Sequence, residues 1–519
     1  MGLKVYTSLD LELQNLGEKI ISEQKDKIEK KYKAKNIALV AINPNNGEIL
    51  AMIGGRDFQE SQVNIWMPEK EQSFQSPGST FKPIVYASAF KKGYTLDTII
   101  WDVRINFGGN PPYVPQNYDG KFRGPITMKE ALAQSLNVPA VKTLYLVGIS
   151  HAADLAKKMG MFESFKTESS KIGLSMAIGG KDIIPLELVS AYGVLATEGT
   201  RHLPKFILKI EDKNKEIIFE AEKKGIKVLD TEICRQINYI LSDNNLRAPM
   251  FGLRSPLNLG PSVAVKTGTA ANERDEITDL WTIGYTKNLV VGVWIGNNKN
   301  EPFKGLGAGV AAPLWHNFIK EVTKNHPKEN FTPPQPIKTD NMALKGDFPK
   351  IKVKINKITK KIATDNTPPE LIEEKEFYQP YSILQLVNKN NPRLKTPSSG
   401  DPLIESWEEG IIKWLEETEG LAPKEKDDVY TFENKPKIEI LSKNRTTDEI
   451  NFTLKIIAPM GTKRTEVFLE EKSVSLIEGS ETSPSFIFKT IDLGEKSEYR
   501  FKIIVTDTVE NKGEIELVI

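Results

Sequence analysis

Residues 76–83 read Ser76-Pro77-Gly78-Ser79-Thr80-Phe81-Lys82-Pro83, and an apolar segment, residues 84–90, follows directly. The apolar segment predicts a buried helix. Pro77 and Gly78 end whatever element precedes, so we expect Ser79 at or near the N-terminus of that helix. Ser79 and Lys82 are three residues apart and therefore share one helix face.

This spacing suits nucleophilic catalysis. A serine hydroxyl is a weak nucleophile until a base takes its proton, and a desolvated lysine with a lowered pKa can be that base. The helix N-terminus adds positive potential where an oxyanion would develop. The S-x-x-K pattern alone is weak, because Ser22-Glu23-Gln24-Lys25 also satisfies it in a polar helix where we expect no chemistry.

A second pattern, S-x-N, occurs three times, as Ser135-Leu136-Asn137, Ser242-Asp243-Asn244 and Ser442-Lys443-Asn444. A serine and an asparagine two residues apart can project from a loop into one cleft, where the serine relays protons and the asparagine binds an amide. Taken in isolation, each tripeptide favours a turn: the first two follow helical runs, and the third lies in a β-rich region.

The third pattern is Val265-Lys266-Thr267-Gly268-Thr269, at the end of a predicted strand. Its lysine can neutralise a carboxylate, its hydroxyls can donate hydrogen bonds, and its glycine lets another backbone approach closely. Such a strand is suited to holding a peptide by its terminal carboxylate. On its own, the segment would be interpreted as an ordinary exposed strand end.

The three patterns together are far more specific than any one of them. S-x-x-K opening a helix, then S-x-N, then K-T-G on a strand is the motif order of penicillin-recognising acyl-serine enzymes. The chain resembles the transpeptidase half of class A penicillin-binding proteins, the bifunctional murein synthase family, over about residues 3–335. Other stretches that carry the resemblance are residues 5–10, 177–180, 185–188, 248–253 and 293–296. The family context selects Ser135 and Asn137 over the other two S-x-N tripeptides.

The resemblance implies an α+β, penicillin-binding/serine-transferase fold, in which helices flank an antiparallel sheet and an all-helical subdomain is added. The hydrophobic pattern agrees, since strand-like runs bracket a mostly helical middle. These runs are residues 37–42, 48–53, 263–265, 280–285 and 289–295.

The resemblance also implies residue roles. Lys82 would deprotonate Ser79, and Ser135, hydrogen-bonded to Lys82 and close to Lys266, would pass a proton to the leaving amine. Asn137 would bind the peptide amide. Lys266, Thr267 and Thr269 would hold the terminal carboxylate, with Gly268 completing the substrate-binding strand. The backbone N–H groups of Ser79 and Thr269 would form the oxyanion hole.

The implied reaction is DD-transpeptidation, which cross-links peptidoglycan stem peptides ending in D-Ala-D-Ala through an acyl-serine intermediate. β-Lactams would be covalent inhibitors, and no metal or organic cofactor is required. Three alternatives stay open. A DD-carboxypeptidase uses the same residues with water as acceptor, a serine β-lactamase deacylates quickly, and a non-catalytic chain would serve as a β-lactam sensor or cell-wall scaffold.

Four segments are expected along the chain. Residues 1–35 predict an interdomain linker helix with Thr7 and Asp10 as a capping pair, and residues 36–335 form the transpeptidase domain. Residues 336–435 predict an extended wrap with a basic edge strand and one amphipathic helix. Residues 436–519 carry about seven short strands, which is typical of an immunoglobulin-like sandwich that could bind wall polymer or a protein.

Composition limits the remaining possibilities. Lys plus Arg number 70 and Asp plus Glu number 69, so the formal net charge of +1 argues against a nucleic-acid-binding protein. The single cysteine, Cys234, excludes an intrachain disulfide and a Cys-based zinc site, and we expect it in the core. The glycine-rich stretch 305–309 predicts a turn that enters a helix rather than a nucleotide loop.

No apolar run approaches the ~18 residues that span a bilayer. Full-length members of the family carry an N-terminal membrane helix and a glycosyltransferase domain, and we expect neither in these residues. The sequence would then be a truncated form, or the other half a separate chain. The expected location is extracytoplasmic, with anchoring to the membrane only through a segment absent here.

Overall fold

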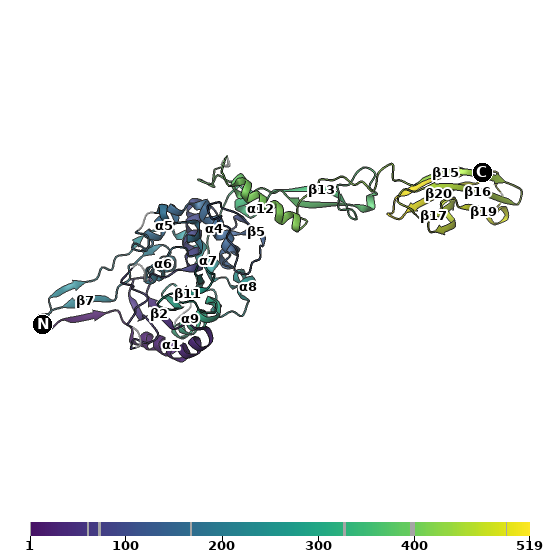
Figure 1. The fold of residues 1–519 in the computed structure, drawn as a ribbon. Coiled ribbons are helices and arrows are strands. Elements are labelled where there is room, and N and C mark those ends of the chain that lie inside the picture. The colour runs from purple at the N-terminus through teal and green to yellow at the C-terminus, as the bar shows by residue number, and fades with distance from the viewer. Residues whose placement is uncertain are drawn as a thin grey trace. The chain divides into compact units, whose positions relative to one another are not determined.

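The computed structural model describes residues 2–59, 62–70, 74–166, 169–324, 329–394, 400–494 and 496–519. The chain divides into two compact units. The first comprises Met1–Pro349 and Pro380–Trp414, and the second comprises Lys350–Gln379 and Leu415–Ile519. The first unit mixes helices and strands, as expected, and the second is mostly antiparallel β structure (Figure 1).

The helices of the first unit are α1 (Leu11–Tyr32), η2 (Gly78–Phe81), α2 (Lys82–Lys92), α3 (Met128–Ala133), α4 (Asn137–Val147), α5 (Ile149–Lys158), η3 (Ser169–Lys171), η4 (Leu174–Ile178), α6 (Pro185–Ala196), α7 (Thr231–Ser242), α8 (Asn244–Phe251), α9 (Gly307–Val322), α10 (Met342–Lys345), α11 (Ile383–Leu386) and α12 (Ile404–Glu417). None of the described helices combines the length and the apolar composition needed to cross a bilayer.

The strands of the first unit are β1 (Lys4–Thr7), β2 (Asn36–Ile42), β3 (Ile49–Ile53), β4 (Ile99–Asp102), β5 (Gly124–Thr127), β6 (Thr200–Arg201), β7 (Ile207–Glu211), β8 (Ile217–Glu220), β9 (Ile226–Lys227), β10 (Ala264–Ala271), β11 (Ile277–Tyr285) and β12 (Val290–Gly296). Five of them form the central antiparallel sheet in the order β10-β11-β12-β2-β3. The sheet therefore joins segments from both ends of the region, as the hydrophobic pattern predicted.

Helices cover both faces of the central sheet. Along β2, alternate side chains enter different cores: Leu39 packs into the cluster that contains α1 and α9, and Val40 packs into the cluster that contains α2, α4, α6 and α7. Figure 1 shows α1 and α9 on one side of β2 and β11, with α4 to α7 on the other. A strand buried on both faces reads as a continuous apolar run, which is why residues 37–42 were recognisable from sequence.

The N-terminal segment differs from the expected single helix. Residues 4–7 form strand β1, which pairs with β7 in a three-stranded sheet, and the helix begins only at Leu11. Asp10 alone caps α1, accepting hydrogen bonds from the backbone of Glu12 and Leu13, so the predicted Thr7–Asp10 capping pair is wrong. Thr7 is instead the last residue of β1. No local signal in the sequence indicates this strand, because its partner strand lies about 200 residues away.

The K-T-G segment lies inside a strand rather than at its end. β10 extends from Ala264 to Ala271 because it pairs with β11 along its whole length. The expectation of a strand over 263–265 alone was wrong. The sequence did not reveal the longer strand, because the small residues after Lys266 lack a strand-like apolar pattern.

The glycine-rich stretch 305–309 enters α9, and Cys234 is buried, both as predicted.

The tryptophans of α12 pack within the first unit. Trp407 contacts the ring of Tyr145 at 5.9 Å between centroids, and Trp414 contacts Trp101 at 5.8 Å. The predicted amphipathic helix in this region is confirmed as α12.

The second unit contains a hairpin and two sheets. The hairpin pairs β13 (Lys350–Asn356) with β14 (Ile372–Tyr378), so the basic strand predicted near 350–361 has a partner that the sequence did not suggest. The remaining strands are β15 (Lys437–Arg445), β16 (Glu449–Ile457), β17 (Thr462–Leu469), β18 (Lys472–Glu478), β19 (Ser485–Lys489), β20 (Arg500–Asp507) and β21 (Lys512–Val518). They form sheets of order β15-β16-β19 and β18-β17-β20-β21 around one core.

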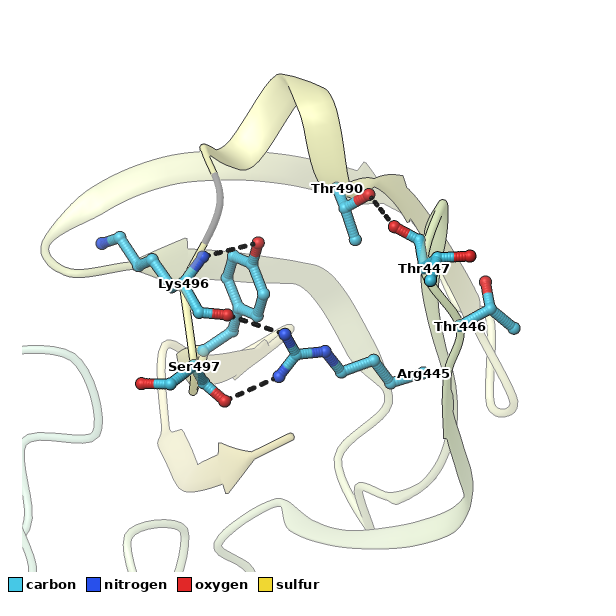
Figure 2. Close-up of a pocket in the computed structure, with 7 residues that line it drawn as sticks. Arg445, Thr446, Thr447, Thr490, Lys496 and Ser497 are labelled. Carbon is cyan, nitrogen blue, oxygen red and sulfur yellow. Dashed lines mark hydrogen bonds between the residues drawn. The ribbon is translucent and has the colours of Figure 1, made fainter.

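About seven strands were expected in this region and the described residues form seven, although Ser442 lies within β15 at a register shift rather than in a turn. The immunoglobulin-like classification stays a prediction. Figure 2 shows a polar hollow in these sheets, lined by residues that include Arg445, Lys496 and Ser497. The Arg445 guanidinium donates to the backbone carbonyls of Lys496 and Ser497, at 2.7 and 2.8 Å. These bonds attach the segment of Lys496 and Ser497 to β15, so the hydrogen bonds of the Arg445 guanidinium are made within the protein.

Candidate active site

Ser79 lies in the turn that opens the buried helix. η2 (Gly78–Phe81) continues directly into α2, whose first residue is Lys82. Pro83 follows at the first turn, where a missing N–H costs least. Ser79 is therefore near a helix N-terminus, as predicted, and Lys82 is one turn further along the same face.

Two glycines allow this turn to lie directly against the K-T-G strand. A Cβ on Gly78, which has φ +51°, would come within 2.5 Å of the Thr269 carbonyl oxygen. A Cβ on Gly268 would lie 2.7 Å from the Pro77 oxygen. The backbones of η2 and β10 are in contact, which brings the backbone around Ser79 and that around Thr269 together.

Two buried side chains from different elements hold the turn in place. The Trp281 indole N–H donates to the Ser76 carbonyl at 2.9 Å, and the Tyr192 hydroxyl donates to the Thr80 carbonyl at 2.6 Å. Both donors come from elements packed on η2, one from β11 and the other from α6. The segment that contains Ser79 is thus fixed by groups more than 100 residues away in sequence.

Lys82 connects the first motif to the second. Its Nζ donates to the Ser135 backbone oxygen at 2.6 Å and to the Asn137 side-chain oxygen at 2.8 Å. Ser135 lies between α3 and α4 with φ +61°, a left-handed conformation that a serine adopts only under constraint. Its hydroxyl faces Lys266, whose Nζ donates to the Ser135 Oγ at 2.7 Å. The structure therefore joins Ser135 to Lys82 through the backbone and to Lys266 through the side chain.

Burial lowers the pKa of both lysines. The Lys82 side chain is 0% exposed, and burial first, with the charge of Lys266 second, lowers its pKa well below the usual value. Burial and the nearby Arg247 guanidinium lower the pKa of Lys266 to about 7. A lysine that loses its proton this readily can accept the proton of a neighbouring serine.

The other S-x-N tripeptides are in structural positions. Ser242 ends α7, where its hydroxyl donates to the Tyr239 carbonyl, and Asp243 caps α8. Ser22 lies in the middle of α1. Of the predicted residues, Ser79, Lys82, Ser135, Asn137 and Lys266 to Thr269 are brought together by the contacts between η2, α2, the α3–α4 turn and β10.

Arg247 was not predicted. It is buried on α8, donates to the Leu241 carbonyl at 2.6 Å, and faces Lys266 closely enough to lower its pKa. An arginine in a short polar helix gives no sequence signal for this location, because its burial depends on tertiary contacts such as the one its side chain makes with the Val265 carbonyl.

Comparison with known proteins places the chain in a family. The family described as "Penicillin binding protein transpeptidase domain" matches residues 37–320. Penicillin-binding protein 2D of Bacillus subtilis is 30% identical over 346 residues, which are 65% of this chain and 47% of that protein. Penicillin-binding protein 1A of Aquifex aeolicus is 34% identical over 315 residues, which are 58% of this chain and 40% of that protein.

A solved structure shows the same fold. The penicillin-binding protein PonA1 of Mycobacterium tuberculosis superposes with a TM-score of 0.56 and 24% sequence identity, over 65% of this chain and 89% of that chain. The same protein has been solved in complex with penicillin V. The chain spans less than half of the length of the two curated relatives above. On the match to residues 37–320, with the three motifs meeting at one place, this chain belongs to the penicillin-binding protein transpeptidase family.

Proposed function

We propose that the chain is a serine DD-transpeptidase that cross-links peptidoglycan stem peptides ending in D-Ala-D-Ala and is acylated by β-lactams. The observation that carries the proposal is the meeting of Lys82, Ser135 and Lys266, in which two buried lysines of lowered pKa both bind the same serine. Membership of the transpeptidase family supports it further.

In the first half-reaction, Ser79 Oγ attacks the carbonyl carbon between the two D-alanines while Lys82 accepts the hydroxyl proton. The backbone N–H groups of Ser79 and Thr269 stabilise the oxyanion, and the contact of Gly78 with Thr269 supports this pairing. The C–N bond then breaks, Ser135 passes its hydroxyl proton to the departing D-alanine amine, and Lys266, which donates to the Ser135 Oγ, replaces that proton. An acyl-serine ester and free D-alanine result.

In the second half-reaction, an amine from another stem peptide attacks the ester and restores the Ser79 hydroxyl. The terminal carboxylate of the donor is bound earlier, by Lys266, Thr267 and Thr269 with Gly268 leaving room for its backbone, and it departs with D-alanine at the end of the first half-reaction. Asn137 binds the peptide amide. Because Asn137 already accepts a hydrogen bond from Lys82, it links substrate position to the base.

The direct test is intact-mass measurement of the chain after incubation with benzylpenicillin, followed by peptide mapping. We expect one adduct per chain, on the peptide that contains Ser79, and no adduct in Ser79→Ala. Labelling that survives Ser79→Ala would overturn the assignment and favour a sensor or scaffold. Product analysis with stem peptides distinguishes the transpeptidase from a carboxypeptidase, since only the former yields cross-linked dimers.

The extracytoplasmic location, the lack of glycosyltransferase chemistry in these 519 residues and a wall or protein partner for the C-terminal sheets stay predictions. Incubation of residues 436–519 with isolated cell wall tests the last of these, and we expect retention on the wall if these sheets bind polymer.

A further inference from the structure

Helix α4 begins at Asn137, yet the residue at its N-cap position, Leu136, offers no side-chain hydrogen bond. The missing acceptor comes from a distant loop. The side-chain oxygen of Asn117 accepts from the backbone N–H groups of Asn137 at 2.8 Å and Val138 at 3.2 Å. Asn117 is only 4% exposed, so this is an internal cap rather than a surface contact.

The orientation of the Asn117 carboxamide is fixed by Asp102. Asn117 Nδ2 donates to both carboxylate oxygens of Asp102, at 2.8 and 2.9 Å, and to the Lys121 carbonyl at 2.9 Å. Asp102 is the fully buried last residue of β4 and also accepts from the Arg123 backbone N–H at 3.0 Å. A carboxylate can only accept, so the amide nitrogen must face Asp102 and the amide oxygen must face α4.

The residue next to Asn117 holds the side chain of Asn137. The Gln116 carbonyl accepts from Asn137 Nδ2 at 2.9 Å, which turns Asn137 Oδ1 toward Lys82 Nζ at 2.8 Å. Two consecutive loop residues therefore fix the backbone and the side-chain orientation of Asn137. The chain of contacts runs from Asp102 through Asn117 to Asn137 and ends on the lysine one turn from Ser79.

We propose that Asp102 and Asn117 are positioning residues of the acyl-transfer site, which hold the Ser135–Asn137 turn in register with Lys82. The inference rests on the proposed function. Neither residue touches the reacting atoms, and they act only through Asn137 and the start of α4.

Asp102 also acts on the site through its charge. The Asp102 carboxylate interacts electrostatically with Lys82 and Tyr86 on α2, with Lys142 on α4, and with Arg123, which directly precedes β5. Lys82 also interacts with Lys266 on β10. Lys142 Nζ donates to the Trp101 carbonyl at 2.8 Å, and burial lowers the pKa of this lysine to about 7. The Asp102 carboxylate raises the pKa of Lys82 against the effects of burial and Lys266. Removing its charge should therefore make Lys82 lose its proton at a lower pH.

The test compares Asn117→Ala and Asp102→Asn with Asn341→Ala as a matched control. Asn341 also caps a helix, α10, through its side-chain oxygen and donates to the Leu386 carbonyl, but it takes no part in the site. The measured quantities are the second-order rate constant of acylation by benzylpenicillin between pH 5 and 9, the melting temperature, and amide hydrogen exchange over residues 136–140.

We expect Asn117→Ala to be acylated about 10- to 100-fold more slowly, because small misplacements in an active site carry losses of this size. Its pH profile should keep the wild-type midpoint, and exchange at Asn137 and Val138 should accelerate. Asp102→Asn should also slow acylation and should move the acid limb of the profile to lower pH. Asn341→Ala should lower the melting temperature without changing either the rate or the profile.

Acylation of Asn117→Ala at the rate of Asn341→Ala, or an unmoved acid limb in Asp102→Asn, overturns the inference. If Asn117→Ala does not fold, Asn117→Asp keeps the side-chain size and the cap but places a second carboxylate against Asp102, and the same slowing is expected. A wild-type chain that is not acylated at Ser79 refutes the proposed function instead, while the exchange at Asn137 and Val138 still tests the positioning contacts.

Discussion

Lys82 illustrates how burial and a neighbouring positive charge lower the pKa of a lysine. The described residues place no carboxylate in direct contact with its Nζ, whose hydrogen bonds are to a backbone oxygen and an amide oxygen. Both acceptors are uncharged, so they offset the cost of burying a positive charge only in part. Burial and the charge of Lys266 therefore lower the pKa of Lys82 and shift it toward its neutral form, which is the form that can take the Ser79 proton.

The pH dependence of acylation follows from the two lysines. The rate should rise with pH as Lys82 loses its proton, with a midpoint well below 10.5, because burial and Lys266 lower its pKa. It should fall again above about pH 7, the pKa of Lys266, because neutral Lys266 no longer attracts the carboxylate of the ligand. The measurement is the second-order acylation rate constant for benzylpenicillin from pH 5 to 10. In Lys266→Arg the alkaline limb should disappear, and a flat wild-type profile would contradict this account.

The backbone conformation of Ser135 predicts that one substitution raises the stability of the fold while it lowers the acylation rate. Its φ of +61° is strained for serine and free of strain for glycine. Ser135→Gly should therefore raise the free energy of unfolding by about 1 kcal/mol. The same change removes the hydroxyl that Lys266 binds, so acylation should slow by about 100-fold or more.

Denaturant unfolding and acylation kinetics of the same preparation measure the two effects. Ser135→Ala is the control, since it loses the hydroxyl but keeps the strain and should gain no stability. A Ser135→Gly protein that is acylated at the wild-type rate would show that the Ser135 hydroxyl transfers no proton during acylation.

At the scale of elements, the contact of η2 with β10 is the arrangement on which the site depends. A methyl group on Gly268 would meet backbone and side-chain atoms of η2 within 3.0 Å. Gly268→Ala should thus push the strand from the nucleophile turn, with a loss of about 1–3 kcal/mol in unfolding free energy and of most acylation. Thermal unfolding and labelling by a fluorescent penicillin measure both.

Gly309→Ala is the matched control for this substitution. A Cβ on Gly309 would have no atom within 4 Å, and the residue lies in α9, so alanine should be neutral or slightly stabilising. Equal behaviour of the two alanine variants would mean that the close approach of η2 and β10 is not required.

Sequence could predict the elements whose signal is local. The buried strand at residues 37–42, the helix after Ser79 and the amphipathic helix near Trp407 all follow from hydrophobic periodicity, and the motif order predicted Ser79, Lys82 and Lys266 as site residues. The pairing of β1 with β7 and of β13 with β14 was missed, since strand pairing across long separations depends on partners that no local window contains.

The same limit applies to the site. Asn117 and Asp102 lie in a polar loop and at the end of a short strand, and only the folded chain brings them to Asn137. Likewise, the motif alone could not tell that Lys82 binds the Ser135 backbone while Lys266 binds its hydroxyl.

At the scale of the whole molecule, the two C-terminal sheets have their own hydrophobic core, separate from both cores of the first unit. A chain ending at Lys435 loses the bonds of Tyr430 and Val429 to residues 509 and 511, but none of the site contacts described above. It should be acylated by benzylpenicillin within about twofold of the full chain, a difference of less than 0.5 kcal/mol in barrier. A tenfold or greater loss would show that these sheets contribute to the site.

The order of strands in the central sheet has a consequence for how the chain comes to be folded. Strand β2 is buried along its whole length between β3 and β12, and β12 is made only after some 250 further residues. Until then a strand that is apolar from Ile37 to Ile42 has one unpaired edge, and such edges pair readily with other chains. The first unit should consequently fold slowly, and only after β12 has been synthesised. A ribosome-stalled chain that ends before Val290 should aggregate rather than stay soluble.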